Sequence, residues 1–144
     1  MKRASLFFML SALLATPTWA VTLIKNDEAK LPAGAGVLAT RGIARGPGVK
    51  MVSPEPAATV TSPFNLKVVF EPRGGATIDP ASAKVTYLKA TPVDLLPRVK
   101  PGLSDKGIVV DGAEAPPGEH EIQISVQDSE GRVTNTVIRL NVVK

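Results

Sequence analysis

From residue 49 onward, apolar and polar residues alternate along short stretches of the chain. Residues 119–127 show this most clearly, because an apolar residue or His120 occupies every second position between polar neighbours. Such alternation places apolar and polar side chains on opposite faces of a β-strand. No segment shows the period of an amphipathic helix. The strands expected from the pattern are residues 49–52, 64–71, 84–88, 93–96, 107–110, 119–127 and 138–142.

Turn residues separate these expected strands. Pro116-Pro117-Gly118 matches a type II turn, in which proline sets a negative φ and glycine supplies the positive φ that follows. Residues 128–131 fit a hairpin in which Gly131 is left-handed and the Asp128 carboxylate caps nearby backbone N–H groups. Residues 79–82 predict a further turn. The pattern predicts an all-β fold, an antiparallel immunoglobulin-like β-sandwich of about seven strands, with a small barrel as the alternative.

Residues 1–20 have the features of a signal peptide. Lys2 and Arg3 precede an apolar run over residues 4–15, Pro17 follows that run, and Thr18 and Ala20 are the small residues at the −3 and −1 positions of a cleavage site. The run is shorter than the ~20 residues that a helix needs to span a bilayer. We therefore expect cleavage after Ala20, no membrane span, and a periplasmic or secreted protein.

Residues 21–48 show neither helical nor strand periodicity. Residues 33–36 and 45–48 are rich in glycine, which favours turns or flexible chain. Five basic residues against two acidic ones between positions 21 and 50 hold the positive excess of the mature chain. We expect an extended leader outside the folded domain, either a solvated linker or a weak contact with anionic surfaces. The expected division is thus 1–20 signal peptide, 21–48 leader and 49–144 immunoglobulin-like domain.

The amino-acid composition excludes several common types of catalytic site. The chain has no cysteine, one histidine and 4% aromatic residues, which excludes cysteine nucleophiles and zinc sites built from three or four His or Cys ligands. We expect His120 to be a hydrogen-bonded structural residue, because alternation places it on the apolar face of a strand. The formal net charge of +4, without a cluster of basic residues, does not predict nucleic-acid binding. We expect no enzyme and no cofactor, and assign no catalytic, cofactor-binding or metal-binding residue.

Three segments resemble the immunoglobulin-like modules of bacterial exported proteins. Residues 78–85 carry Ile-Asp-Pro, a small residue, Ser, two further residues and Val; residues 117–122 carry Pro-Gly-x-His; and residues 128–132 carry Asp-x-x-Gly. The resemblance covers about residues 50–144 and consists mostly of turn chemistry. It implies a small exported protein with one such domain, and many of these proteins have no assigned activity.

Residues 52–60, followed by the strand 64–71, resemble the opening of periplasmic copper-binding sandwiches of the copper-resistance type. That family needs a histidine at the mature N-terminus and further His or Met ligands. The expected mature chain begins at Val21 and retains only His120 and Met51 as soft or imidazole ligands. We therefore expect no copper site.

The function favoured by the sequence is a non-enzymatic binding or structural module of the cell envelope. Its partner is expected to be another envelope protein or a second copy, joined through a sandwich edge or through the leader acting as a strand. The alternative is a small-ligand or calcium-binding sandwich that acts through carboxylates on loops. The candidate carboxylates are Asp79, Asp94, Asp105, Asp111, Glu114, Asp128 and Glu130.

Overall fold

The computed structural model describes residues 20–34 and 45–144 of the chain. The expected signal peptide therefore lies outside the described residues, apart from Ala20. Within the described residues, no helix is long and apolar enough to cross a membrane.

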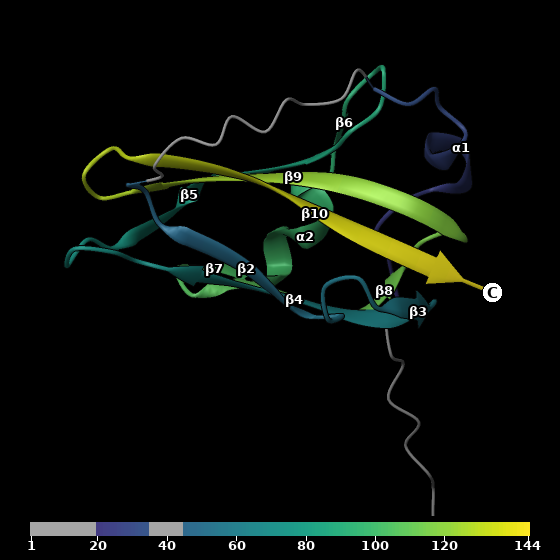
Figure 1. Ribbon diagram of the computed structural model, residues 1–144, viewed down its shortest axis with the longest axis horizontal. Coiled ribbons are helices and arrows are strands. Elements are labelled where there is room, and N and C mark those ends of the chain that lie inside the picture. The colour runs from purple at the N-terminus through teal and green to yellow at the C-terminus, as the bar shows by residue number, and fades with distance from the viewer. Residues whose placement is uncertain (1–19, 35–44) are drawn as a thin grey trace, which may run out of the picture.

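The described chain folds into two five-stranded sheets that lie one above the other (Figure 1). One sheet has the order β1-β8-β4-β2, with β7 also paired to β8, and the other has the order β3-β10-β9-β5-β6. The helical segments are α1 (Asn26–Ala29), α2 (Leu96–Val99) and the 3-10 turn η1 (Lys100–Gly102). The strands are β1 (Val21–Thr22), β2 (Gly48–Ser53), β3 (Thr59–Thr61), β4 (Phe64–Glu71), β5 (Ile78–Tyr87), β6 (Val93–Asp94), β7 (Leu103–Ser104), β8 (Gly107–Glu114), β9 (Gly118–Asp128) and β10 (Val133–Val143).

The strand order confirms the expected immunoglobulin-like sandwich. The series β2-β4-β8-β7 corresponds to strands A, B, E and D of that fold, and β10-β9-β5 corresponds to G, F and C. Most pairs are antiparallel, but β1 pairs with β8 and β3 pairs with β10 in parallel, so both sheets are mixed. Seven strands have three or more residues, and β1, β6 and β7 have two each.

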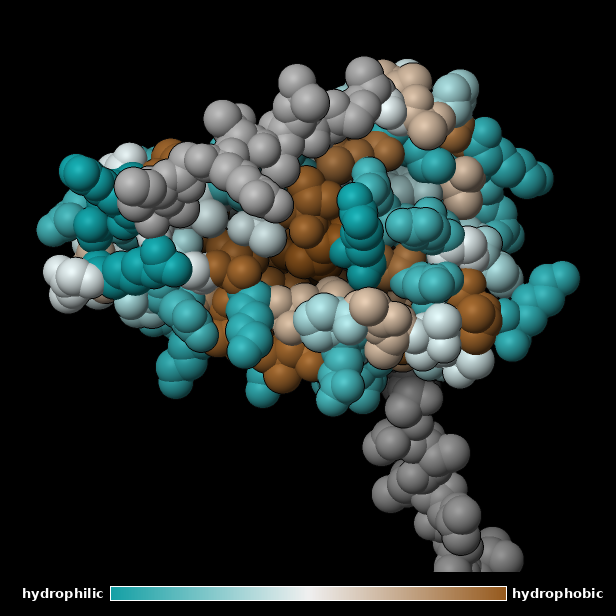
Figure 2. Space-filling model, in the orientation of Figure 1, coloured by the Kyte–Doolittle hydropathy of each residue, from teal (hydrophilic) through white to brown (hydrophobic). Residues whose placement is uncertain are grey.

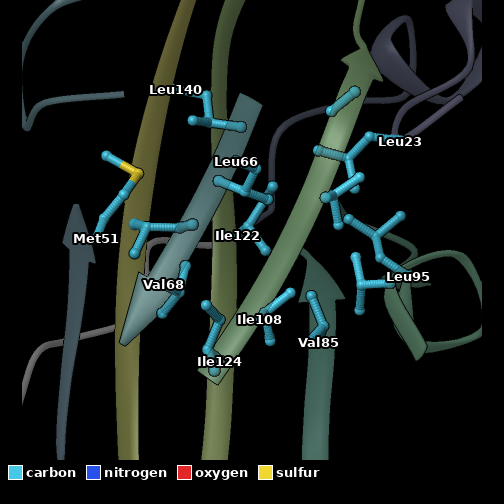
Figure 3. Close-up of a cluster of buried hydrophobic side chains, with 14 of the residues drawn as sticks. Leu23, Met51, Leu66, Val68, Val85, Leu95, Ile108, Ile122, Ile124 and Leu140 are labelled. Atoms are coloured by element: carbon cyan, nitrogen blue, oxygen red, sulfur yellow. The ribbon is translucent and has the colours of Figure 1, made fainter. Parts of the chain in front are cut away.

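Alternating apolar residues fill the space between the two sheets. In β9 and β10, every second side chain points inward, and all of these from His120 to Asp128 and from Thr134 to Val142 are buried except Thr136, which is partly buried. Leu66 and Val68 of β4 and Ile108 of β8 face Ile122 and Ile124 of β9 across the core (Figure 3). The facing predicted for residues 119–127 is therefore confirmed, with Ile124 only 1% exposed.

The hairpin between β9 and β10 also follows the prediction. Gly131 has a φ of 79°, and Asp128 Oδ1 accepts hydrogen bonds from the backbone N–H groups of Glu130 and Arg132. Gly118 likewise has a positive φ, of 136°, where β9 begins.

Two local predictions differ from the structure. Residues 79–82 do not end a strand, because they form an irregularity inside β5, between Asp79 and Lys84, with the Ala81 N–H bonded to Asp79 Oδ1. The expected strand 93–96 shortens to β6, and the chain then turns into α2. Leu95 and Val99 are buried, so this apolar run packs as a single helical turn, too short to show a helical period.

The expectation that residues 21–48 form a leader outside the fold is wrong for the described part of that segment. Val21 and Thr22 pair with Ala113 and Glu114 of β8, and the next two residues, Leu23 and Ile24, belong to the core cluster. The backbone N–H groups of both core residues donate to Glu114 O, at 2.9 and 3.2 Å. Two adjacent buried residues after a two-residue strand leave no periodic trace in a sequence, which is why the pattern missed them.

We expect Ile124→Asp to lower the free energy of unfolding by about 3–5 kcal/mol, because it buries an unpaired carboxylate in the centre of the core. Gln123→Asp is the matched control, since the neighbouring side chain points to the outer face and is only half-buried. Urea melts of the two variants measure the difference. Equal losses would contradict the facing of β9.

We expect Leu23→Ala to lower the free energy of unfolding by about 2–5 kcal/mol, the usual range for removing most of a buried leucine side chain. Leu23 is 0% exposed, whereas Thr22 beside it is exposed, so Thr22→Ala serves as the control with a small effect. A urea midpoint unchanged by Leu23→Ala would restore the view of a leader outside the fold.

Candidate functional site

An ion pair fastens the N-terminal segment to the sandwich. The Arg98 guanidinium on α2 donates to both carboxylate oxygens of Glu28 on α1, at 2.7 and 2.6 Å. The same guanidinium donates to Leu23 O at 3.0 Å, next to the buried apolar pair. We call Glu28, Arg98 and Leu23 O the N-terminal clasp. Hydrogen bonding from Arg98 holds the pKa of Glu28 below its ordinary value, although burial opposes this, and the bond to Glu28 raises the pKa of Arg98.

The single histidine lies in a buried pair with the single tyrosine. Tyr87 Oη lies 2.8 Å from His120 Nδ1, and His120 Nε2 lies 2.7 Å from Pro116 O. Because a carbonyl oxygen only accepts, neutral His120 carries its proton on Nε2, and Tyr87 donates to Nδ1. Burial raises the pKa of Tyr87, and the nearby Glu28 charge adds to this.

This pair identifies His120 as a structural residue. The imidazole is 2% exposed, and both of its ring nitrogens are already bonded to protein atoms. A general base needs a free nitrogen within hydrogen-bond reach of a nucleophile or substrate. Lys89 links the N-terminal segment to this pair. Its Nζ donates a hydrogen bond to Ala29 O at 3.2 Å and lies 5.2 Å from the centre of the Tyr87 ring.

A shallow hollow of about 510 Å³ lies where the N-terminal segment meets the start of the β8–β9 connection. Asp27 and Glu114 are its two carboxylates, and Lys25 is its cation. Within residues 20–34 and 45–144, no three His, Cys, Asp or Glu side chains are grouped so that they could hold a metal ion. The hollow is lined by Thr22, Ile24, Lys25, Asn26, Asp27, Ser62, Glu114, Ala115 and Pro116.

Four of the other candidate carboxylates cap backbone or pair with arginine, and one of them is Asp79, whose Oδ1 accepts a hydrogen bond from the Ala81 N–H. Asp128 is buried, which raises its pKa, but hydrogen bonds from the backbone of Arg132 and Glu130 and from the Arg132 side chain outweigh this and lower it. Glu130 pairs with the same arginine at 2.8 Å. Asp94 accepts from the Leu96 N–H at the start of α2. Asp105 and Asp111 are exposed, the first before β8 and the second within it. Asp128 and Glu130 thus share Arg132, and no three of the candidate carboxylates in the described residues are grouped so that they could hold a metal ion.

Other residue types that hold ligands in proteins are engaged here in the core or in turns. Met51 of β2 is buried among the core side chains, as Figure 3 shows. Gly74 and Gly75 both have positive φ, of 62° and 74°, and form the turn between β4 and β5. The aromatic residues Phe64, Phe70 and Tyr87 are all buried, so none of them offers a stacking surface for a sugar ring.

The longest regular open strand edge belongs to β10. Its pairing with β9 runs from Val133 to Val142 without a register shift. On its other side, β3 pairs only with residues 141–143, and Gly46 lies against the backbone of Val133 at the opposite end. Residues 135–140 have no strand beside them among the described residues, and we call them the β10 edge.

The other outer strands of the described sandwich are short or irregular. β1, β6 and β7 have two residues each and β3 has three. β2 is longer, but its pairing with β4 is interrupted between Met51 and Ser53, and it carries the charged Lys50. Short length, irregular pairing and lysine are common ways in which proteins protect strand edges from pairing with other chains. The β10 edge has none of these except one arginine, Arg139.

Apolar surface gathers on the face of the molecule that carries β10 and β2. Figure 2 shows hydrophobic residues in the middle of this face, where it is hollowed, with polar side chains around them. Apart from this hollow, Val133 and Val137 of β10 are 53% and 38% exposed on the outer side of their sheet. Exposed apolar surface beside an open edge is typical of a protein-binding surface.

Sequence reasoning missed the N-terminal clasp and did not single out one edge. The clasp joins residues 70 positions apart, and no local pattern links Glu28 to Arg98. The sequence did predict part of β10, as the expected strand 138–142. It could not show that this strand begins at Val133 or that residues 135–140 lie at a sheet edge, because the edge depends on the order of the strands.

The clasp predicts an acid-dependent loss of stability. Because folding lowers the pKa of Glu28, its ion pair contributes stability above the unfolded-state pKa and loses it as the pH falls through the folded-state value. We expect Glu28→Gln to lower the free energy of unfolding by about 1–2 kcal/mol near neutral pH. Urea melts between about pH 7 and about pH 3 should show this deficit shrinking as acid is added. Asp27→Asn, an exposed neighbour on α1, is the control, and a deficit that stays constant with pH would contradict the role of the carboxylate charge.

No protein-family model matches the chain, and no curated protein matches its sequence. The structure is similar to that of CopC from Methylosinus trichosporium OB3b, with 19% identity and a TM-score of 0.44, over 66% of this chain and 93% of that one. It is also similar to an engineered protein (16% identity, TM-score 0.44) and to the endo-beta-1,4-mannanase from Thermotoga petrophila (15% identity, TM-score 0.46). These two matches cover 68% and 74% of this chain but only 20% and 21% of the respective proteins. Similarity at this level assigns this chain no function.

Proposed function

We propose that this chain is an exported, non-enzymatic module of the cell envelope that binds another protein chain by accepting a strand along the β10 edge. The observation that carries the proposal is the open stretch of β10 between the contact with Gly46 and the pairing with β3. A strand added there would form main-chain hydrogen bonds with β10 and extend the sheet beyond it.

The side chains along the edge suit such a contact. β10 carries no acidic residue, and the charge of its only basic residue, Arg139, is met by Glu121 on β9 at 3.1 Å. The exposed Val137 lies in the middle of the open stretch and offers an apolar contact to a neighbouring strand. A partner strand thus meets no unpaired charge at its centre, where desolvation is most costly.

Export is supported by the start of the fold. The first strand begins at Val21, the residue that follows the expected cleavage site, so the mature chain would keep every described residue of the sandwich except Ala20. We propose the absence of enzyme activity because both His120 nitrogens are bonded to protein atoms. The candidate carboxylates form caps or ion pairs, line a shallow hollow or are exposed, and none lies within hydrogen-bond reach of the histidine.

We expect a photo-crosslinking amino acid at position 137 to give one discrete crosslinked product in cells that export the protein. The same photo-crosslinking amino acid at position 109 is the control, because Val109 is similarly exposed, at 47%, but lies on β8 in the other sheet. Gel mobility and mass spectrometry give the number and identity of the crosslinked products. Mass spectrometry of the same sample also shows whether the processed chain begins at Val21. Crosslinks from position 109 and none from position 137 would contradict the proposal.

A further inference from the structure

We propose that the partner of the β10 edge is a short, free extended segment of another chain, with an acidic residue at each end of an apolar centre. The inference rests on the proposed function and names the chemistry of the partner that this surface takes. Such a segment would be a chain terminus or a linker, not the edge of a second folded sheet.

The open stretch of β10 directs alternate backbone N–H and C=O groups away from β9. The Asp128 N–H donates to Arg132 O where the hairpin closes, and the ladder continues from there without a register shift. Bonded and non-bonded pairs alternate along an antiparallel ladder, so the even-numbered residues of β10 bond to β9 and the odd-numbered residues face the open edge. The bond from the Leu88 N–H to Glu121 O agrees, because it directs the odd-numbered residues of β9 toward β5. The residues with outward-directed N–H and C=O groups in the open stretch are therefore Asn135, Val137 and Arg139.

Both ends of this stretch are occupied, which limits the length of a partner strand. β3 lies beside residues 141–143, and a Cβ placed on Gly46 would lie 3.2 Å from Val133 O. Residues 135–139 between them span about 17 Å at the rise of an antiparallel strand. A strand that a folded sheet carries straight on would meet β3 or the chain at Gly46, whereas a free segment can turn away at both ends. The edge therefore favours a linear segment of about five residues.

The middle of the stretch is apolar. Val137 is 38% exposed on the outer face, so an apolar residue placed opposite it would pack against it. On the inner face, Thr136 is the one inward-pointing residue between Thr134 and Val142 that is only partly buried. The neighbours of the central residue in an added strand would point to this inner side, toward the hydrophobic hollow between β10 and β2 (Figure 2). Three successive apolar residues therefore suit the centre of the partner.

Cations flank this apolar middle. The side chain of Arg139 is 70% exposed, and among the described residues only its Nε is bonded, to Glu121 at 3.1 Å. Its two Nη groups can therefore donate to a second carboxylate. At the other end, the exposed Arg45 directly precedes Gly46, the residue that lies against Val133. β10 holds no acidic residue, so charge complementarity favours an acid at each end of the partner.

NMR titration of the protein from Val21 to Lys144 with synthetic peptides tests this chemistry. The probe is a peptide with blocked ends in which one Asp on each side encloses three Val residues, and the control peptide carries Lys in place of both Asp. We expect the acidic peptide to bind with a Kd of about 1 mM or below, and the basic peptide to bind at least about tenfold more weakly. Equal binding of the two peptides, or binding of neither, would overturn the inference.

The same titration tests the direction of the backbone groups. The amides of residues 135, 137 and 139 should shift more than those of residues 136 and 138, because only the first set faces the peptide. A peptide with Pro in place of its central Val lacks the N–H that would pair with Val137, and its binding should be lost. Equal shifts of odd and even amides, or full binding of the proline peptide, would contradict strand pairing in this register.

A charge-removing variant tests the acidic ends of the partner. Arg139→Gln should weaken binding of the acidic peptide by about two- to fivefold, the effect of losing one exposed ion pair. Lys67→Gln is the matched control, because it removes an exposed cation from β4 in the other sheet and should leave the affinity unchanged. Equal effects of the two variants would overturn charge recognition at the β10 edge.

The crosslinking at position 137 separates the two proposals. A partner captured through an acidic and apolar terminus or linker supports both. A partner captured through a strand of a folded domain overturns the short acidic segment and keeps strand addition at the β10 edge. With neither a crosslink from position 137 nor peptide binding, both proposals fall.

Discussion

The alternation of buried and exposed residues along the long strands is the constraint on which the rest of this structure depends. The chain has no cysteine, so no disulfide holds the two sheets together, and the packed side chains between β4, β8, β9 and β10 must do so. A shift of one residue in any of these pairings would turn the core-facing side chains to the solvent. The core therefore fixes the register of every long strand, and the order of the strands in each sheet decides which edges stay open.

The N-terminal segment completes this core. Leu23 and Ile24 lie beside β8 at the side of the cluster where Leu95 also packs (Figure 3). The N-terminal clasp and the contacts of Lys89 hold this segment from the outside, with Tyr87 and His120 buried behind it. One side of the sandwich is thus closed by short strands, α1 and α2, while the side with β10 and β2 retains a regular open edge. This asymmetry is the physical basis of the function proposed for the chain.

The parts of the fold that could be predicted are those in which local chemistry decides the outcome. Ile122 and Ile124 alternate with polar residues, and Asp128 with Gly131 closes a hairpin by its own hydrogen bonds, so neither needs information from distant residues. The packing of Leu23 and the bond between Glu28 and Arg98 depend on which segments the fold brings together. The open edge of β10 could not be predicted for the same reason, because it is a property of strand order. His120 could be placed, since its position in an alternating strand already assigned it to the buried face.

The central claim is that residues 135–140 of β10 form an edge that takes up a strand. Amide hydrogen exchange, followed residue by residue by NMR, tests it most directly, because outward-directed N–H groups of an edge strand exchange quickly until a partner bonds them. The account predicts that alternate amides between Asn135 and Leu140 exchange quickly in dilute protein. It also predicts that they become protected when the partner captured by crosslinking at position 137 is added, while the amides of β4 do not change. Slow exchange throughout this stretch in the dilute protein, or exchange rates that the captured partner leaves unchanged, would contradict it.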